Sequence, residues 1–320
     1  MLLYILFILG FVLLVKGADM LVSGASSIAK RFKISDMVVG LTIVSFGTSL
    51  PELIINIMSS VQGQSELAIG NVFGSNVANL LLIIGIAAII CPLPIKRNTI
   101  LTEIPFSLIA TLLVGFLANA VLIGDKTSLY ISRIDGAVLL FFFVLFMAYI
   151  WNIAKTNKDE VIEDDVAPTM TMPKSVLYIV LGGTGLFLGG KWVVDGAVTI
   201  AQSFGLSESF IGLTIVAIGT SLPELVTSAM AAYRRNIDIA IGNVVGSNIF
   251  NLLWILGISA LINPLPFNVV SNSDIVMMIF ASTLLIIAIP IGKKNTIDRW
   301  NGILFIAIYI AYIVFLVQRG

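Results

Sequence analysis

Two stretches of the chain read GLTIVSFGTSLPELIINIMSSVQGQSELAIGNVFGSNVANLLLIIG, over residues 40–85, and GLTIVAIGTSLPELVTSAMAAYRRNIDIAIGNVVGSNIFNLLWILG, over residues 212–257. They align without a gap at a constant offset of 172 residues, and 26 of their 46 positions are identical. Each copy carries a glutamate within an apolar run, Glu52 in the first and Glu224 in the second. A carboxylate inside a membrane segment is costly and usually marks a functional site. The duplication therefore predicts one site built from two halves.

The composition of the whole chain is typical of a polytopic membrane protein. Of its 320 residues, 58% are hydrophobic and only 11% are charged, far less charge than a soluble domain of this length carries. We therefore expect the protein to lie in the lipid bilayer. We expect no nucleic-acid partner, and no protein partner is evident from the sequence. Ten apolar spans are long enough to cross the hydrocarbon core. They cover residues 2–27, 36–60, 67–91, 99–122, 130–153, 175–201, 209–232, 239–262, 274–291 and 300–318.

The charged residues of the loops predict how these spans are arranged. Lys and Arg number thirteen in the loops after spans 1, 3, 5, 7 and 9, and three on the opposite side. By the positive-inside rule, the odd-numbered loops are cytoplasmic and both termini lie outside the cell membrane. We expect a five-helix half over residues 1–153, a cytoplasmic linker over 154–174, and a second five-helix half over 175–320. Because each half has an odd number of spans, the second half is inverted, as in secondary transporters.

The motif GTSLPE, at Gly47–Glu52 and again at Gly219–Glu224, places a proline inside a membrane helix. Proline removes one backbone hydrogen bond and clashes with the carbonyl four residues earlier, so we expect helices 2 and 7 to be broken at Pro51 and Pro223. Freed carbonyls are tolerated at membrane depth where they face protein or a polar cavity. Hydroxyl and carboxylate groups stand beside them, at Thr48, Ser49, Glu52, Thr220, Ser221 and Glu224. These are all oxygen donors, which calcium and sodium prefer and zinc and copper do not.

A second duplicated motif reads GNVFGSNVAN at Gly70–Asn79 and GNVVGSNIFN at Gly242–Asn251. Its glycines are typical of a packing seam between membrane helices. Residues four apart share a helix face, which places Ser75 with Asn79, and Ser247 with Asn251. The other asparagines lie off that face, and we expect them to bond to neighbouring helices; they are Asn71, Asn76, Asn243 and Asn248.

Through these paired motifs the chain resembles the cation/calcium exchanger superfamily, and prokaryotic sodium/calcium exchangers in particular. The signature repeats of that superfamily resemble residues 40–85 and 212–257, and its ten-helix inverted plan resembles nearly the whole chain. The resemblance implies a secondary antiporter in which sodium entry drives calcium out by alternating access. It also implies a set of ion ligands. They are Glu52, Glu224, Thr48, Ser49, Thr220, Ser221, Ser75, Asn79, Ser247 and Asn251, with backbone carbonyls from Ser45 and Ala217.

The motifs also bear on the subtype. In potassium-dependent relatives the residue matching Asn251 is typically an aspartate, so the asparagine here, like its repeat mate Asn79, favours exchange without potassium. Proton/calcium exchangers of plants and fungi are distinguished by a glutamate in the motif read here as GNVFGSN. The chain has no histidine, the usual proton relay at neutral pH. A calcium/proton antiporter that uses the same two glutamates remains the alternative.

Two other classes fit the sequence poorly. An intramembrane protease would want two aspartates and a metalloenzyme would want histidine, so we do not expect an enzyme. A passive channel does not need two broken helices with matched oxygen donors. We expect no resident cofactor; Ca²⁺ and Na⁺ are bound as transported substrates.

Overall fold

Helices make up nearly all of the described chain. The computed structural model describes residues 2–120, 129–156, 170–204, 217–291 and 295–319. Eight of the described helices are long and apolar enough to cross a membrane, and a bent pair over residues 36–61 makes a ninth. The chain is therefore an all-helical, multi-pass membrane protein. The seventh expected span, 209–232, begins in residues outside the described part, so the total of ten stays a prediction.

The bounds of the helices follow the expected spans closely. In the first half they are α1 (Leu2–Phe32), α2 (Asp36–Val39), η1 (Gly40–Val44), α3 (Ser45–Thr48), α4 (Leu50–Val61), α5 (Ser65–Val77), η2 (Ala78–Ile83), α6 (Ile84–Ile90), α7 (Arg97–Leu101), α8 (Glu103–Asn119) and α9 (Arg133–Thr156). In the second half they are α10 (Met172–Ser203), α12 (Ala217–Thr220), α13 (Leu222–Tyr233), α14 (Ile237–Ile249), η5 (Phe250–Ile255), α15 (Leu256–Ile262), η6 (Val269–Ser271), α16 (Asn272–Ala288) and α17 (Arg299–Arg319). Both ends of the expected linker are therefore helical, and its middle, 157–169, lies outside the described residues.

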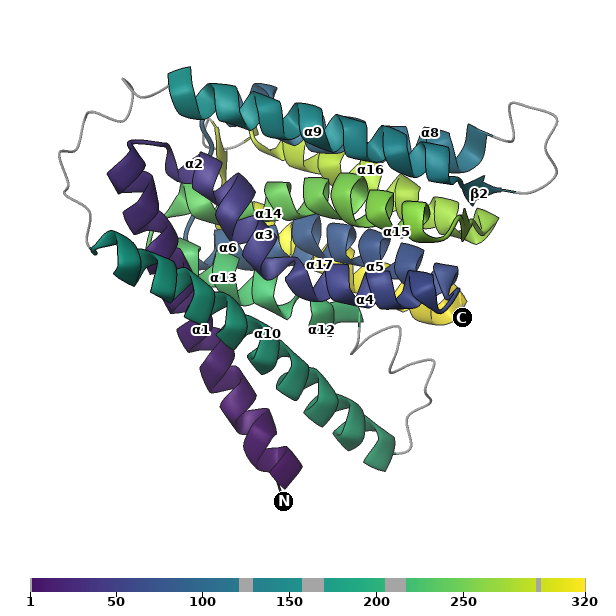
Figure 1. Cartoon of the computed structure of the whole chain (residues 1–320), viewed down its shortest axis with the longest axis horizontal. Helices are drawn as coiled ribbons and strands as arrows, with labels where there is room; N and C mark the ends of the chain where they lie inside the picture. The colour runs from purple at the N-terminus through teal and green to yellow at the C-terminus, as the bar shows by residue number, and fades with distance from the viewer. Residues whose placement is uncertain (1, 121–128, 157–169, 205–216, 292–294, 320) are drawn as a thin grey trace.

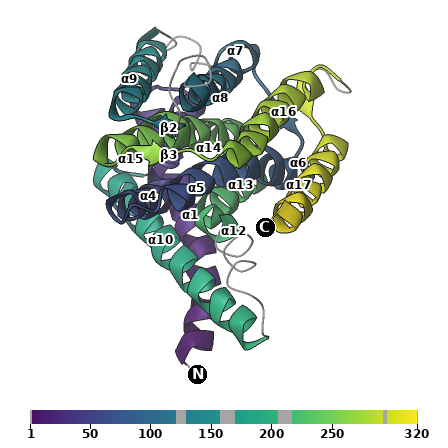
Figure 2. The same cartoon turned by 90° about the vertical axis from the view of Figure 1, so that its right-hand side faces the viewer.

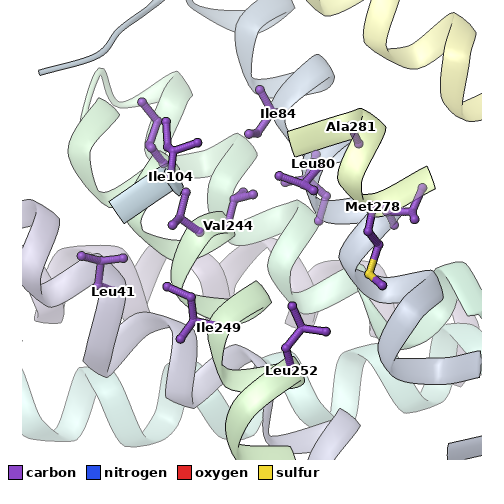
Figure 3. Packing of buried hydrophobic residues seen from close by; sticks show 14 of the residues in the cluster. Leu41, Leu80, Ile84, Ile104, Val244, Ile249, Leu252, Met278 and Ala281 are labelled. Carbon is purple, nitrogen blue, oxygen red and sulfur yellow. The ribbon is translucent and has the colours of Figure 1, made fainter. Parts of the chain in front are cut away.

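The innermost helices are the two that carry the GN…GSN motifs. The continuous helices Ser65–Ile90 and Ile237–Ile262 are far more buried than the other membrane spans. Their side chains form the centre of one apolar core, which Figure 3 shows from close by, with Leu80, Val244 and Leu252 among its members. Because apolar groups surround them on all sides, these helices must satisfy their polar side chains within the protein.

Helix α14 packs closely against α2 and η1 because its glycines leave the space. A Cβ atom on Gly242 would lie 2.9 Å from the carbonyl oxygen of Met37. A Cβ atom on Gly246 would lie 2.9 Å from the backbone of Leu41 and would overlap the hydroxyl of Ser45. The expected packing seam is thus present at both glycines of the second repeat.

Helices α1 and α10 cross each other obliquely and extend beyond the other helices in both views (Figures 1 and 2). Their contacts run antiparallel. A Cβ atom on Gly10 would lie 2.9 Å from the carbonyl oxygen of Gly189, and one on Gly17 would lie 2.8 Å from that of Gly182. Glycine recurs every seventh residue, at Gly10, Gly17 and Gly24 in α1 and at Gly182, Gly189 and Gly196 in α10. These two sets match at the same offset of 172 residues.

Two very short strand pairs join loops of opposite halves. Strand β1 (Leu93–Pro94) pairs antiparallel with β4 (Thr296–Ile297), and β2 (Tyr130–Ile131) pairs with β3 (Leu265–Pro266). They lie at opposite ends of α8, because β1 precedes that helix and β2 follows it. The all-helical prediction does not include these ladders, since a strand of two residues leaves no alternating pattern to read.

The glycine seam between α1 and α10 can be tested through Gly17→Ala. The added methyl group meets the backbone of α10, which cannot move aside as a side chain could, so we expect destabilisation of about 1–3 kcal/mol. The measurement is the free energy of unfolding in detergent micelles. Gly183→Ala on α10 is the matched control: a Cβ atom there has no neighbour within 4 Å among the described residues. Equal losses of stability in both variants would contradict the seam.

Candidate ion-binding site

The second span is interrupted at Ser49. Helix α3 ends at Thr48, α4 begins at Leu50, and the helix axis turns by 49° between them. Pro51 lies in the first turn of α4, where a missing N–H costs no helical hydrogen bond. The amide of Ser49 still bonds to the carbonyl of Ser45 at 2.9 Å. The break therefore lies three residues before Glu52, which is 1% exposed.

The second repeat has the same arrangement at matching positions. Helix α12 ends at Thr220, α13 begins at Leu222, and Pro223 lies in its first turn. The backbone at Ser221 has φ −87° and ψ 7°, against −85° and 6° at Ser49. Glu224 follows in the first turn of α13 and is 1% exposed. Each repeat thus presents one carboxylate three residues after the helix break.

Hydrogen bonds between the repeats bring these helix breaks together. The Ser49 hydroxyl donates to Glu224 Oε1 at 3.0 Å. It also lies 3.1 Å from the Ser247 hydroxyl on α14. Four of the expected ligands, with Thr48 only 3.5 Å from Ser247, therefore form one buried cluster across the two repeats.

Two asparagines hold the threonines of the opposite repeat in place. Thr48 donates to Asn243 Oδ1 at 3.0 Å, and Thr220 donates to Asn71 Oδ1 at 3.1 Å. The two contacts are equivalent by the repeat, because Thr48 matches Thr220 and Asn71 matches Asn243 at the offset of 172 residues. Asn248 likewise accepts a bond of 2.9 Å from Asn79. The expectation that such asparagines bond to neighbouring helices is thus confirmed for Asn71, Asn243 and Asn248.

Six of the expected ligands have a buried side-chain oxygen that lacks a hydrogen-bond partner among the described residues. Both oxygens of Glu52 and the second oxygen of Glu224 are of this kind. So are the side-chain oxygens of Ser75, Asn79, Ser221 and Asn251. Buried polar atoms are normally paired, and each one left unpaired costs about 1–3 kcal/mol. A cation bound by these oxygens would supply the missing partner.

The two repeats differ in which of their matching hydrogen bonds are formed. Ser49 bonds to Glu224, Asn79 bonds to Asn248, and the Asn243 amide donates to Ser228 at 2.9 Å. At the positions matching these contacts, buried polar atoms have no partner in the described part of the chain. They belong to Glu52, Asn56, Asn71, Asn76, Ser221 and Asn251. The expected ion ligands, named the cage from here on, are therefore hydrogen-bonded near Glu224, whereas those near Glu52 lack partners in the described part.

Sequence reasoning missed one pair of positions. Asn56 and Ser228 match in the two repeats and follow their glutamates by one helical turn. Asn56 donates to the carbonyl of Glu52 at 2.9 Å, and Ser228 accepts from Asn243. Their polarity on the same helix face as the glutamates is the signal that would have identified them.

Helical geometry also departs from the expected pattern at two ligands. Asn79 lies in η2 and Asn251 in η5, two π-helical stretches at matching positions. Such stretches are rare and frequently occur at functional sites. Nothing in the sequence distinguishes them from α-helix.

Ser45 and Ala217 were expected to contribute backbone carbonyls. The Ser45 carbonyl accepts the amide of Ser49, and the Ser45 hydroxyl bonds to the Gly40 carbonyl at 2.7 Å and the Asn243 carbonyl at 3.1 Å. Ser45 therefore fastens the second span to α14. Ala217 is the first residue of α12. Its part in ion binding stays a prediction, as does that of the Ser45 carbonyl.

The charge of the cage is its main chemical property. Neither Glu52 nor Glu224 takes part in any ion pair of the described residues, and no described group of three or more acids, histidines or cysteines is present. The expected ligands offer carboxylate, hydroxyl and amide oxygens, which are the donors that Ca²⁺ and Na⁺ prefer. Unpaired carboxylates inside the membrane helices of a protein are typical of a cation transporter.

Comparison with known proteins gives the family. Residues 2–152 and 174–318 match the family model described as sodium/calcium exchanger protein. The chain belongs to this family, and the resemblance read from the paired motifs is confirmed. It is thus a cation/calcium antiporter of the membrane, not an enzyme.

Similar proteins span its whole length. The putative antiporter CaxA of Alkalimonas amylolytica is 38% identical over 95% of both chains. The sodium/calcium exchanger MaX1 of Methanosarcina acetivorans is 34% identical over 98% of both. A solved structure of the sodium-calcium exchanger NCX_Mj superposes with a TM-score of 0.81 at 32% identity, covering 98% of each chain.

The contact between Thr48 and Asn243 can be measured by a double-mutant cycle of Thr48→Val and Asn243→Ala. Because the two side chains share a buried hydrogen bond, we expect a coupling energy of about 0.5–1.5 kcal/mol. The measurement is denaturant unfolding in detergent micelles. Thr42→Val replaces Thr48→Val in the control cycle, since the Thr42 hydroxyl bonds to the Val38 carbonyl instead. An additive Thr48–Asn243 cycle would show that the contact does not join the repeats.

Proposed function

We propose that the protein exchanges Na⁺ for Ca²⁺ across the cell membrane by alternating access, with both ions competing for the cage around Glu52 and Glu224. One observation carries this proposal: two carboxylates are buried between the repeats, with oxygens that lack partners and without a basic side chain paired to either in the described part. The names of the similar proteins MaX1 and NCX_Mj favour sodium as the coupling ion.

The architecture that we propose for this exchange has ten spans in two inverted halves, 1–153 and 175–320. The linker lies in the cytoplasm and both termini lie outside. The antiparallel contacts of α1 with α10 support the inversion, because the pair Gly10–Gly189 becomes the pair Gly182–Gly17 under the 172-residue offset. The proline breaks in the second and seventh spans would then meet in one layer of the membrane.

The proposed ligands divide between the halves. Glu52 and Glu224 bind either ion, and hydroxyl or amide oxygens complete the coordination. These come from Thr48, Ser49, Ser75 and Asn79 in the first half and from Thr220, Ser221, Ser247 and Asn251 in the second, with the carbonyls of Ser45 and Ala217. A site with two carboxylates and no third acid is neutralised by one Ca²⁺ or by two Na⁺.

The charge of the cage gives a reason for coupled transport. Two unpaired carboxylates in an apolar surrounding are costly, and cations remove that cost. The occupied protein therefore changes between its two facing states more easily than the empty one, so that Ca²⁺ leaves only when Na⁺ replaces it. We expect α1 and α10 to be the elements that slide, because glycine backbone forms their seam.

Radiolabelled Ca²⁺ flux in proteoliposomes tests the coupling ion. We expect Ca²⁺ uptake to follow an outward Na⁺ gradient and to be insensitive to a proton ionophore. Glu52→Gln should reduce this flux to the background of empty liposomes, because it removes one of the two charges that balance Ca²⁺. It should also remove the rise in unfolding temperature that Ca²⁺ causes in the wild-type protein.

Glu66→Gln is the matched control for this experiment. Glu66 is an exposed carboxylate in the first turn of α5 and lies 3.5 Å from the Asn268 amide, away from the cage. We expect its flux to equal that of the wild-type protein. Wild-type flux in Glu52→Gln would remove the proposed site, and Ca²⁺ flux driven by a pH gradient without Na⁺ would replace sodium exchange by proton exchange.

Asn251→Asp tests the role of ligand charge. A third carboxylate in the cage raises the charge facing the ion, so we expect a higher apparent affinity for Ca²⁺ and weaker competition by Na⁺. The measurement is Ca²⁺-dependent flux at several Na⁺ concentrations. Asn152→Asp, on the exposed end of α9, adds the same charge far from the cage and should change neither value. An unchanged ion preference in Asn251→Asp would exclude this residue from the ligands.

A further inference from the structure

A lateral cleft of about 650 Å³ lies between elements that are distant in sequence. The second span forms its floor, α9 and η5 form one wall, and α10 forms the other. The volume is within the range of sites that hold small molecules, roughly 300–1,000 Å³. None of the proposed ion ligands lines it.

The side chains that line the cleft have no free hydrogen-bonding group for water. Apart from glycine and two threonines, it consists of apolar side chains. The hydroxyl of Thr42 donates to the Val38 carbonyl at 2.6 Å, and that of Thr184 donates to the Val180 carbonyl at 2.8 Å. Both polar groups are therefore satisfied by their own helices, and a cavity without free polar groups does not hold water.

Flat aromatic rings form the wall opposite α10. Trp254 lies 5.4 Å from Phe46, 6.0 Å from Phe143 and 5.6 Å from Phe250, measured between ring centroids. Phe143 and Phe250 are themselves 5.0 Å apart. Mutual packing holds these rings in place, so the wall is preformed.

The mouth of the cleft is continuous with the lipid-facing surface. Phe46 on the second span is 45% exposed and Val180 on α10 is 57% exposed, and both lie within membrane-spanning helices. At this depth the surrounding solvent is hydrocarbon, so what enters from the side is a lipid tail.

We propose that this cleft binds one acyl chain of a bilayer phospholipid. Moving a tail from the bilayer into the cleft gains no hydrophobic free energy, because both surroundings are apolar. The gain comes from close packing against rigid rings and from filling a space that would otherwise be a void. The lipid is thus selected by the shape of its tail more than by its headgroup.

The bound tail would lie directly behind the proposed ion cage. Phe46, Gly47 and Leu50 line the floor of the cleft and are the sequence neighbours of Thr48 and Ser49. The opposite wall, α10, is one of the two helices that we expect to slide. An acyl chain between them therefore restrains α10 against the broken span, and this effect on exchange rests on the proposed function.

Tryptophan fluorescence in liposomes of phosphatidylcholine brominated in mid-chain tests the binding. The part of the emission that is lost in Trp254→Phe is assigned to Trp254. We expect bromine to quench this part strongly, and Gly183→Phe, measured with and without Trp254→Phe, to remove most of that quenching. A Cβ atom at Gly183 meets no described atom within 4 Å, and Gly183 lines the cleft, so the phenyl ring can extend into the space that the acyl chain would occupy.

Leu181→Phe is the matched control, because Leu181 is a 47% exposed residue of the same helix that does not line the cleft. It should leave the quenching of Trp254 unchanged. As a second measurement, native mass spectrometry should detect one phospholipid retained by the wild-type protein and by Leu181→Phe, but not by Gly183→Phe. Undiminished quenching in Gly183→Phe, or a loss of the same size in Leu181→Phe, would overturn the acyl-chain site whether or not the protein exchanges sodium.

Discussion

Two carboxylates without cationic partners, buried between two copies of one motif, are the constraint on which the rest of the structure depends. A charge at this depth is tolerated only where polar groups or ions compensate it. The interrupted helices bring hydroxyl groups to Glu224, and the asparagines of α5 and α14 hold the threonines of the opposite repeat. The glycines of α14 then allow the second span close enough for these short side chains to meet.

Much of the fold could be predicted because membrane helices leave a strong signal in the sequence. Long apolar runs predicted the spans, and the ungapped repeat predicted one site built from two halves. The π-helical stretches at Asn79 and Asn251 could not be predicted, because their local sequence is ordinary helix-forming sequence and the extra residue per turn is set by packing. The glycines that recur every seventh residue in α1 and α10 are visible in the sequence, but the contacts they make are not. The contacts of Gly10 and Gly17 show what these glycines do.

The burial of the candidate ligands could be predicted from the sequence, but their hydrogen-bond arrangement could not. The paired motifs pointed to residues that the structure buries, because oxygen donors in apolar helices are rare and these were duplicated. The difference between the two halves could not be read from GTSLPE or from GSN, which are identical in both copies. It coincides instead with Asn56 and Ser228, where the copies differ and where one contact is closed and the other is not. Near-symmetry in sequence thus permits a clear asymmetry in structure.

The short strand pairs have a mechanical consequence. Each pair joins a loop of one half to a loop of the other by backbone hydrogen bonds. One pair lies at each end of α8, so the halves are connected at both ends of the bundle. Neither strand pair includes residues of α1 or α10. These pairs oppose separation of the two halves, whereas the sliding of α1 and α10 that we propose would leave both pairs intact.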